Sequence, residues 1–307
     1  GAAMTLADLA GFQPEWVKPI QKDYAGHTVH EIPPNGQGIA ALIALGILDK
    51  LDITRFAVDS VEAQHLQIEA MKLAFADTYK WVADEKYMTQ VTVKDLLDDG
   101  YLSERAKLIK MDQATRFNHG TPPKGGTIYL TAADESGMMV SFIQSNYMGF
   151  GSGVVVPGTG ISLQNRGFSF NLSPNHPNCV APNKRPFHTI IPGFLSKDGQ
   201  PEMSFGVMGG NMQPQGHVQT LIRMLSYNQQ PQAACDAPRW KVNVGMSVDV
   251  EESMPPDVRA ALLARGHKIE NIADSYMDFG AGQFIWKTEN GYIAASDPRR
   301  DGQAVGY

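Results

Sequence analysis

The sequence has no long apolar run, little cysteine and no excess of basic residues, and each absence excludes a class of protein. Without a run of about 18 apolar residues, no segment is expected to span a membrane. A formal net charge of −6 and an isoelectric point near 5.7 argue against nucleic acid as a partner. The two cysteines among 307 residues, Cys179 and Cys235, do not make a disulfide framework and leave the cellular compartment open.

What is present is an ordinary composition for a folded protein. The chain is 43% hydrophobic, with 30 glycines and 19 prolines, and it contains no internal repeat or low-complexity tract. Apolar residues recur at helical spacing in residues 39–51, 61–82 and 93–110, whereas strand-like runs dominate from residue 127 onward. Helices followed by strands and then by mixed elements favour an α+β layered fold.

Two features of the helical half leave alternatives open. The loop at residues 35–38 leads into the helix 39–51. Either its backbone N–H groups bind an anion at the helix N-terminus or, as we favour, the loop is a tight turn into a buried helix. His65 and Glu69 lie one turn apart and are either half of a metal site or part of a solvated helix face. Because no further ligand lies nearby in the sequence, we favour the solvated face and predict no metal.

The stretch from residue 124 to residue 169 organises the rest of the chain. The breakers Gly125 and Gly126 lead directly into alternating residues, which predicts a strand that begins at Thr127. A second strand, residues 138–145, follows a turn and completes a hairpin. The glycine-dense segment 149–160 cannot be regular helix or central strand, and backbone of this kind is used where another group must approach closely.

Several motifs in this order resemble the gamma-glutamyltranspeptidases and related acylases, which are N-terminal-nucleophile hydrolases. The hairpin resembles the start of the family's small subunit, with Gly126-Thr127 at its head and Asp134 and Gly137 in its turn. The motifs that continue the resemblance are FGSGVVVPGTGI at 150–161, Asn165, PNKRP at 182–186, GVMGG at 206–210, DAPR at 236–239, SDPR at 296–299 and GY at 306–307.

The resemblance implies a four-layer αββα sandwich and a self-processing chain. Residues 1–126 would be the C-terminal part of the large subunit, residues 127–307 would be the small subunit, and the two pieces would remain partners. The chain opens with Gly1, without an initiator methionine, and a similar phrase lies midway through the family's large subunit. A substantial N-terminal portion is therefore expected to be missing, and a signal peptide cannot be assessed.

The resemblance assigns the nucleophile to Thr127. A threonine hydroxyl needs a base within reach, and cleavage of the Gly126–Thr127 bond would supply one as the new α-amino group of the same residue. That amino group titrates near pH ~8, close to working pH. Without the resemblance, a threonine at a strand start would be assigned a structural role on its β propensity.

Three further residues match the family's catalytic positions. Gly209 and Gly210 match the oxyanion pair, although a tight strand-to-helix turn would have the same geometry. Ser145 stands where the family has a hydroxyl that bonds the threonine amine, although a strand serine can also be satisfied by backbone groups.

The sequence departs from the true transpeptidases where they hold the glutamyl group. Tyr147, Arg166 and Ser169 replace an asparagine, a glutamine or glutamate, and an aspartate, and Asn165 precedes Arg166. The family's tandem serines are His188-Thr189 here. One carboxylate is lost and one cation is gained, so the pocket should prefer an anionic or neutral acyl group. Arg166 could instead be a structural ion-pair partner.

These residues lead to a prediction of a self-processing amidohydrolase that acts on a gamma-glutamyl-like or dicarboxylic acyl amide. Water or an amine would accept the acyl group. The loop 170–182 is shorter than the lid of many transpeptidases, so the resemblance implies a more open site in which hydrolysis is favoured. No cofactor is expected, and a homo-oligomer is compatible with the sequence. The alternatives are a genuine gamma-glutamyltransferase acting on glutathione-like substrates and an inactive binding or scaffold homologue.

Overall fold

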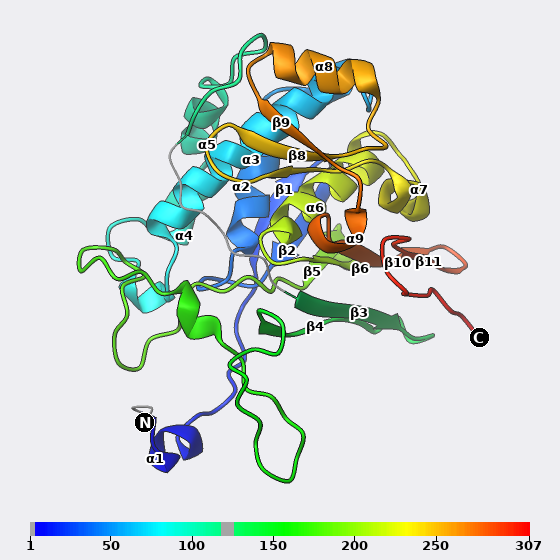
Figure 1. Ribbon diagram of the computed structural model, residues 1–307. Coiled ribbons are helices and arrows are strands. Elements are labelled where there is room, and N and C mark those ends of the chain that lie inside the picture. The colour runs from blue at the N-terminus through cyan, green and yellow to red at the C-terminus, as the bar shows by residue number, and fades with distance from the viewer. Residues whose placement is uncertain (1–3, 118–125) are drawn as a thin grey trace.

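A computed structural model describes residues 4–117 and 126–307 of the chain. The first part is mostly helical, as its periodicity predicts (Figure 1). Its elements are α1 (Leu6–Ala10), β1 (Ile20–Tyr24), β2 (His27–Glu31), α2 (Gly38–Asp49), α3 (Val61–Trp81), α4 (Val93–Leu96) and α5 (Asp99–Ala106). None of the helices in the described parts is both long and apolar enough to cross a membrane.

The second part begins with the predicted hairpin and is richer in strands. Its strands are β3 (Gly126–Ala133), β4 (Met139–Tyr147), β5 (Gly193–Lys197), β6 (Gln200–Met208), β7 (Trp240–Val242), β8 (Ser247–Glu251), β9 (Lys268–Ile272), β10 (Ala281–Thr288) and β11 (Gly291–Ser296). Its helices are α6 (Met212–Leu221), which continues as a π-helical turn at Ile222–Ser226, α7 (Pro231–Asp236), α8 (Pro256–Ala264) and α9 (Ser275–Asp278).

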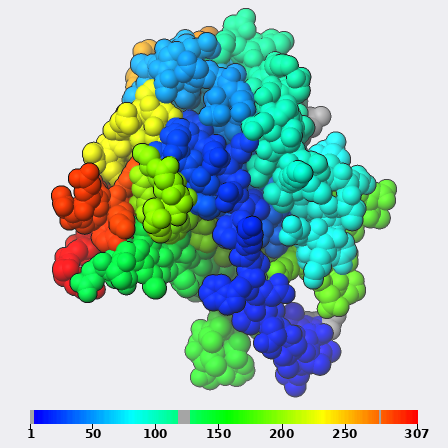
Figure 2. Space-filling view, turned by 180° about the vertical axis from the view of Figure 1, so that it is seen from behind, coloured from blue at the N-terminus to red at the C-terminus, as the bar shows by residue number. Residues whose placement is uncertain are grey.

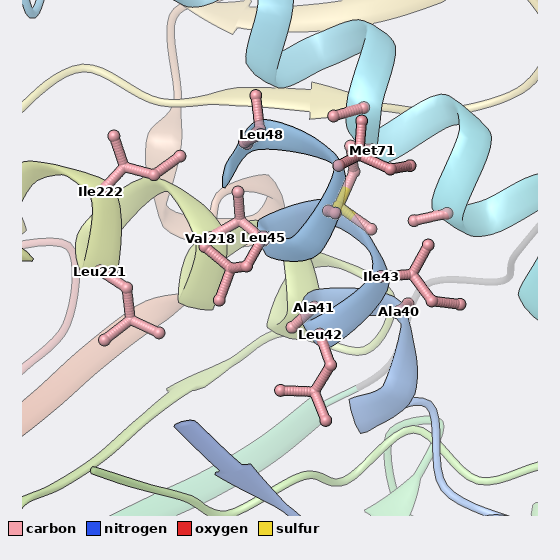
Figure 3. Packing of buried hydrophobic residues seen from close by; sticks show 14 of the residues in the cluster. Ala40, Ala41, Leu42, Ile43, Leu45, Leu48, Met71, Val218, Leu221 and Ile222 are labelled. Carbon is pink, nitrogen blue, oxygen red and sulfur yellow. The ribbon is translucent and has the colours of Figure 1, made fainter. Parts of the chain in front are cut away.

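One six-stranded sheet joins the two parts of the chain. Its order is β1-β2-β5-β6-β10-β11, so β2 from the helical half pairs antiparallel with β5 from the second half. Helix α2 covers this sheet and lies between α3 and α6, where Leu45, Met71 and Val218 meet (Figure 3). Every residue of α2 from Gly38 to Leu48 is buried, as expected for a helix that is apolar on all sides.

The β3–β4 hairpin packs on the opposite face of the sheet (Figure 1). The hydroxyls of Thr131 and Ser204 are in contact. A Cβ atom added at Gly206 would lie 2.5 Å from the ring of Tyr129. Thr131 thus faces Ser204 and Tyr129 faces Gly206, so β3 and β6 run in opposite directions across the two layers. Glycine at position 206 allows this close approach of the two layers.

The described residues thus form an α layer, a β layer and a second β layer, and the predicted α+β class is confirmed. The outer face of β3–β4 presents Ile128, Leu130 and Phe142 with exposed fractions of 67%, 47% and 50%. Helix α1 and the loop after β4 project away from these layers (Figure 2). A separate three-stranded sheet, β7-β8-β9, packs beside α3 and α6.

Three strand-like runs of the second part are not continuous strands in the structure. The run at 242–250 forms parts of two strands, because Gly245 at φ +63° turns the chain between them. The run at 188–195 becomes a strand only at Gly193, directly after Pro192, which lacks the N–H that a ladder needs. Residues 161–170 lie in none of the named strands, and they contain a 3-10 turn at Arg166–Ser169.

The solvated face predicted for His65 and Glu69 is wrong. Both side chains are fully buried, as is Lys72 one turn further along α3. Glu69 and Lys72 form an ion pair, which compensates the burial of both charges.

Candidate active site

Thr127 lies at an irregular position of the hairpin, at the start of β3. Gly126 is in register with Tyr147 and Ile128 with Gln144, so the strand opposite Thr127 carries an extra residue. The Thr127 side chain is 8% exposed, and its Oγ1 donates to Ser145 Oγ at 3.2 Å. The Ser145 hydroxyl also accepts from the backbone N–H of Tyr147 at 2.9 Å. The bulge thus turns the hydroxyls of Thr127 and Ser145 toward each other.

Arg166 contacts the backbone of Ser145. Its guanidinium donates to the Ser145 carbonyl at 3.4 Å and to Thr189 Oγ1 at 3.1 Å, and it stacks 5.3 Å from the ring centroid of Tyr147. The side chain is only 4% exposed, and burial lowers the pKa of Arg166 to about 10. Within residues 4–117 and 126–307, no carboxylate lies within ion-pair distance of this guanidinium. A buried cation with only neutral partners suits an anionic ligand.

The remaining predicted pocket residues surround Arg166. Asn165 Oδ1 accepts from the backbone N–H of Met148 at 3.1 Å and so holds the turn after β4. Burial raises the pKa of the Tyr147 phenol, and a hydrogen bond with Ser169 and the nearby Arg166 oppose that shift. Burial, reinforced by Arg166, lowers the pKa of His188 to about 3, which keeps its imidazole neutral at working pH.

Gly209 and Gly210 follow the end of β6, the strand against which β3 packs. The contacts Thr131–Ser204 and Tyr129–Gly206 run in opposite directions along the two strands, so the start of β3, with Thr127, lies toward the end of β6 that leads into this pair. The two glycines have φ values of +129° and +60°, which side chains on L-residues rarely tolerate. Their carbonyls accept from the first turn of α6, and in the described parts of the chain no backbone acceptor pairs with either N–H. Two free N–H groups at a strand end are suited to bind an oxyanion.

Gln37 holds this pair in place, and the sequence did not single it out. Its Nε2 donates to the Gly210 carbonyl at 2.8 Å and to the Thr189 carbonyl at 2.7 Å, and the side chain is fully buried. The side-chain amide of Gln37 therefore links Gly210 to Thr189, whose hydroxyl is bonded to Arg166. The proline- and glycine-rich loop before α2 was the available signal, but both partners lie more than 150 residues away.

The two interpretations of this loop are now resolved in favour of the tight turn. The N–H groups of Gly36 and Gln37 are used by the carbonyls of Pro33 and His188. A Cβ at Gly38 would lie 2.9 Å from a carboxylate oxygen of Glu31. The carboxylate of Glu31 thus lies against the start of α2, at the place where the sequence also allowed an external anion to bind.

Replacing Gln37 with alanine is expected to lower the free energy of unfolding by about 1–3 kcal/mol, because the Thr189 carbonyl loses its side-chain donor and the Gly210 carbonyl keeps only the N–H of Gln213. If the Gly210 N–H binds an oxyanion, kcat should fall while KM changes little. Urea denaturation and steady-state kinetics test this. Gln64→Ala is the control, since it removes a single bond, to Val58 O, away from the site. Equal effects of the two variants on kcat would show that Gln37 does not position the glycine pair.

Replacing His188 with glutamine is expected to flatten the dependence of stability on pH. The folded-state pKa is about 3, below the unfolded value of about 6.5, so the unfolded chain binds a proton that the folded one does not. His188 therefore destabilises the fold as pH falls from 6.5 toward 3, by up to about 1.4 kcal/mol per pH unit. Urea titrations at pH 4.5 and 7 should show a smaller loss in the variant than in the wild type. An unchanged slope would contradict the assignment.

The comparisons with known proteins agree with this architecture. The family model described as gamma-glutamyltranspeptidase matches residues 1–307. The solved cephalosporin acylase from Bacillus halodurans is 52% identical, with a TM-score of 0.92 over 99% of this chain and 55% of that one.

Several curated relatives match the whole of this chain. Among them are the glutathione hydrolase-like YwrD proenzyme of Bacillus subtilis (36% identical) and the oxamate amidohydrolase proenzyme of Klebsiella pneumoniae (35% identical). The chain spans 59% and 58% of their lengths, respectively.

Proposed function

The chain belongs to the gamma-glutamyltranspeptidase family, and from that premise we propose that it is the nucleophile-bearing part of a self-processing amidohydrolase. The observation that carries the proposal is the buried hydroxyl of Thr127, bonded to Ser145 at the start of β3. Strand β3 packs against β6, and among the described residues no backbone acceptor pairs with the N–H groups of Gly209 and Gly210, which follow β6. The relatives named as proenzymes, which include an acylase from Pseudomonas, support self-processing and amide chemistry.

Processing would begin at the Gly126–Thr127 bond. The Thr127 hydroxyl adds to the Gly126 carbonyl carbon, the peptide C–N bond breaks as the nitrogen takes up a proton, and an ester to Oγ1 remains. Water hydrolyses that ester, which leaves a carboxylate on Gly126 and a free amino group on Thr127. The Ser145 hydroxyl, 3.2 Å from Oγ1, would orient the attacking oxygen.

Turnover would use the same residue as nucleophile and base. The amino group of Thr127 takes the hydroxyl proton while Oγ1 attacks the substrate amide carbonyl, and the N–H groups of Gly209 and Gly210 hold the oxyanion. The C–N bond then breaks, the leaving amine takes the proton, and an acyl ester remains on Oγ1. Water, activated by the same amino group, releases the carboxylic acid.

The proposed pieces, residues 1–126 and 127–307, would stay together after cleavage. Strand β2 of the first pairs with β5 of the second, with His30 in register with Phe194. The apolar helix α2 of the first piece packs against α6 of the second (Figure 3). Cutting the single bond at the start of β3 leaves this shared sheet and core intact.

The acyl group is proposed to carry a carboxylate, because Arg166 is buried without an acidic partner among the described residues. A dicarboxylic acyl amide would place its distal carboxylate on the guanidinium and its amide carbon at Thr127. Hydrolysis of glutaryl-, adipyl- and gamma-glutamyl-anilides by the natural full-length chain tests this assignment. Turnover of the gamma-glutamyl compound alone would favour a true gamma-glutamyltransferase, and an uncut, inactive chain would favour a scaffold.

A further inference from the structure

A buried polar cluster on α3 is used by neither the proposed chemistry nor the pocket. It consists of His65, Glu69 and Lys72 on α3 together with His267, and all four side chains are fully buried. His267 is 202 positions after His65 in the sequence, yet its Nε2 lies 2.8 Å from His65 Nδ1. Burying two charges and two imidazoles is costly, so the cluster should have a defined task.

Each member of the cluster on α3 holds backbone of one segment, residues 110–117. His65 Nε2 donates to the Lys110 carbonyl at 2.7 Å. Lys72 Nζ donates to the Thr115 carbonyl at 2.6 Å, and Glu69 Oε2 accepts from the Thr115 N–H at 2.9 Å. The ion pair of Glu69 and Lys72 thus binds both the backbone N–H and the backbone carbonyl of Thr115.

The second half of the chain holds the same segment from the other side. Arg265 donates through Nε to the Met111 carbonyl at 3.0 Å, and its own carbonyl accepts from the Ala114 N–H at 2.7 Å. His267, two residues further, supports His65. Residues 110–117 are therefore fastened by both proposed pieces of the protein.

This segment precedes the proposed cleavage bond. Phe117 and Gly126 are nine positions apart in the sequence, so the fastened backbone limits the end of the first piece to at most ~30 Å from Phe117. We propose that Glu69, Lys72 and His65 form a clamp that positions the chain for cleavage at Gly126–Thr127. The inference rests on the proposed function, and it makes these three side chains positioning residues rather than catalytic ones.

The charge balance favours a clamp over a metal site. His65, Glu69 and His267 do bring donor atoms within 4.8 Å of one another, a spacing that a metal ion could bridge. However, the ammonium of Lys72 already pairs with Glu69 and neutralises it. A divalent cation added there would leave an uncompensated positive charge in a fully buried cluster.

A double variant, Glu69→Gln with Lys72→Met, tests the clamp in the natural full-length chain. Removing both charges together avoids leaving one of them unpaired, so the fold should persist, while the Thr115 carbonyl loses its donor. The matched control is Asp77→Asn with Arg105→Met. It removes an ion pair between α3 and α5, at 2.6 Å, that does not touch residues 110–117.

The expected result has three parts. Hydrogen exchange of the backbone amides at 110–117 should become about tenfold faster or more, as expected for losing a charged hydrogen bond. The two fragments should appear about tenfold more slowly, whereas kcat/KM of chains that are already split should stay within about twofold. The control should leave exchange at 110–117 unchanged.

Unchanged exchange in the double variant, or equal effects in the control, would overturn the clamp. Tight one-to-one binding of Zn²⁺ by the wild type that the double variant loses would assign the cluster to a metal instead. A wild-type chain that never splits would refute the proposed function, and with it the link to processing. The exchange measurement would still decide whether these side chains fasten the segment.

Discussion

Replacing Thr127 with alanine is expected to leave the natural full-length chain as one uncut polypeptide without amidase activity. Alanine has no oxygen to attack the Gly126 carbonyl, so the base that turnover needs is never released. Activity on an adipyl or glutaryl anilide should fall by about 10³-fold or more, as is typical when a nucleophile is removed. Intact mass and N-terminal sequencing check the processing, and a chromogenic assay checks turnover.

Thr127→Ser is the matched control for this loss. Serine keeps the oxygen that bonds Ser145 at 3.2 Å but lacks the methyl group that fixes the side-chain rotamer. We therefore expect slower splitting and reduced but measurable turnover. Folding of the alanine variant is judged separately by its urea midpoint, because Thr127 contributes one side-chain hydrogen bond of about 1 kcal/mol. Full turnover by the alanine variant, or an intact Gly126–Thr127 bond in active wild-type material, would refute the mechanism.

The fold was predictable where local patterns decide it. The apolar positions of α2 and α3 and the breakers before Thr127 predicted the helices and the hairpin with small boundary errors. The same reasoning failed at His65 and Glu69, which it assigns to a solvated face of α3. His65 is buried because it donates to the Lys110 carbonyl, and Glu69 because it pairs with Lys72 and accepts from the Thr115 N–H; both backbone partners lie more than 40 residues away. A pattern within one helix does not contain that information.

The site was predictable only in part, for a related reason. Motifs identified Thr127, Ser145 and the glycine pair, whose roles remain predictions. Gln37 was missed, since its hydrogen bonds reach Gly210 173 positions later. The sequence motif marks the residues that would react, whereas the residue that holds them comes from a loop whose composition suggests only a turn.

The largest expected change in specificity comes from Arg166. Replacing it with glutamine keeps a side chain of similar reach that can donate to Thr189 or to the Ser145 carbonyl, but it removes the buried positive charge. If that charge binds the distal carboxylate of the acyl group, kcat/KM for glutaryl and adipyl anilides should fall by about 10²-fold. An uncharged hexanoyl anilide should be hydrolysed at nearly the wild-type rate. The ratio of the two values of kcat/KM is the quantity to measure.

Arg166→Lys and Thr189→Val separate binding from structure. Lysine keeps the charge but not the fork that spans Thr189 and Ser145, so it should recover part of the preference for anionic acyl groups. Valine at position 189 removes one neutral partner of the guanidinium, at 3.1 Å, and leaves the charge in place. It should lower stability by about 1 kcal/mol and spare the preference. If Arg166→Gln instead reduces glutaryl and hexanoyl turnover equally, the guanidinium holds the turn after β4 rather than the substrate. The dicarboxylic substrate class would then lose its physical basis.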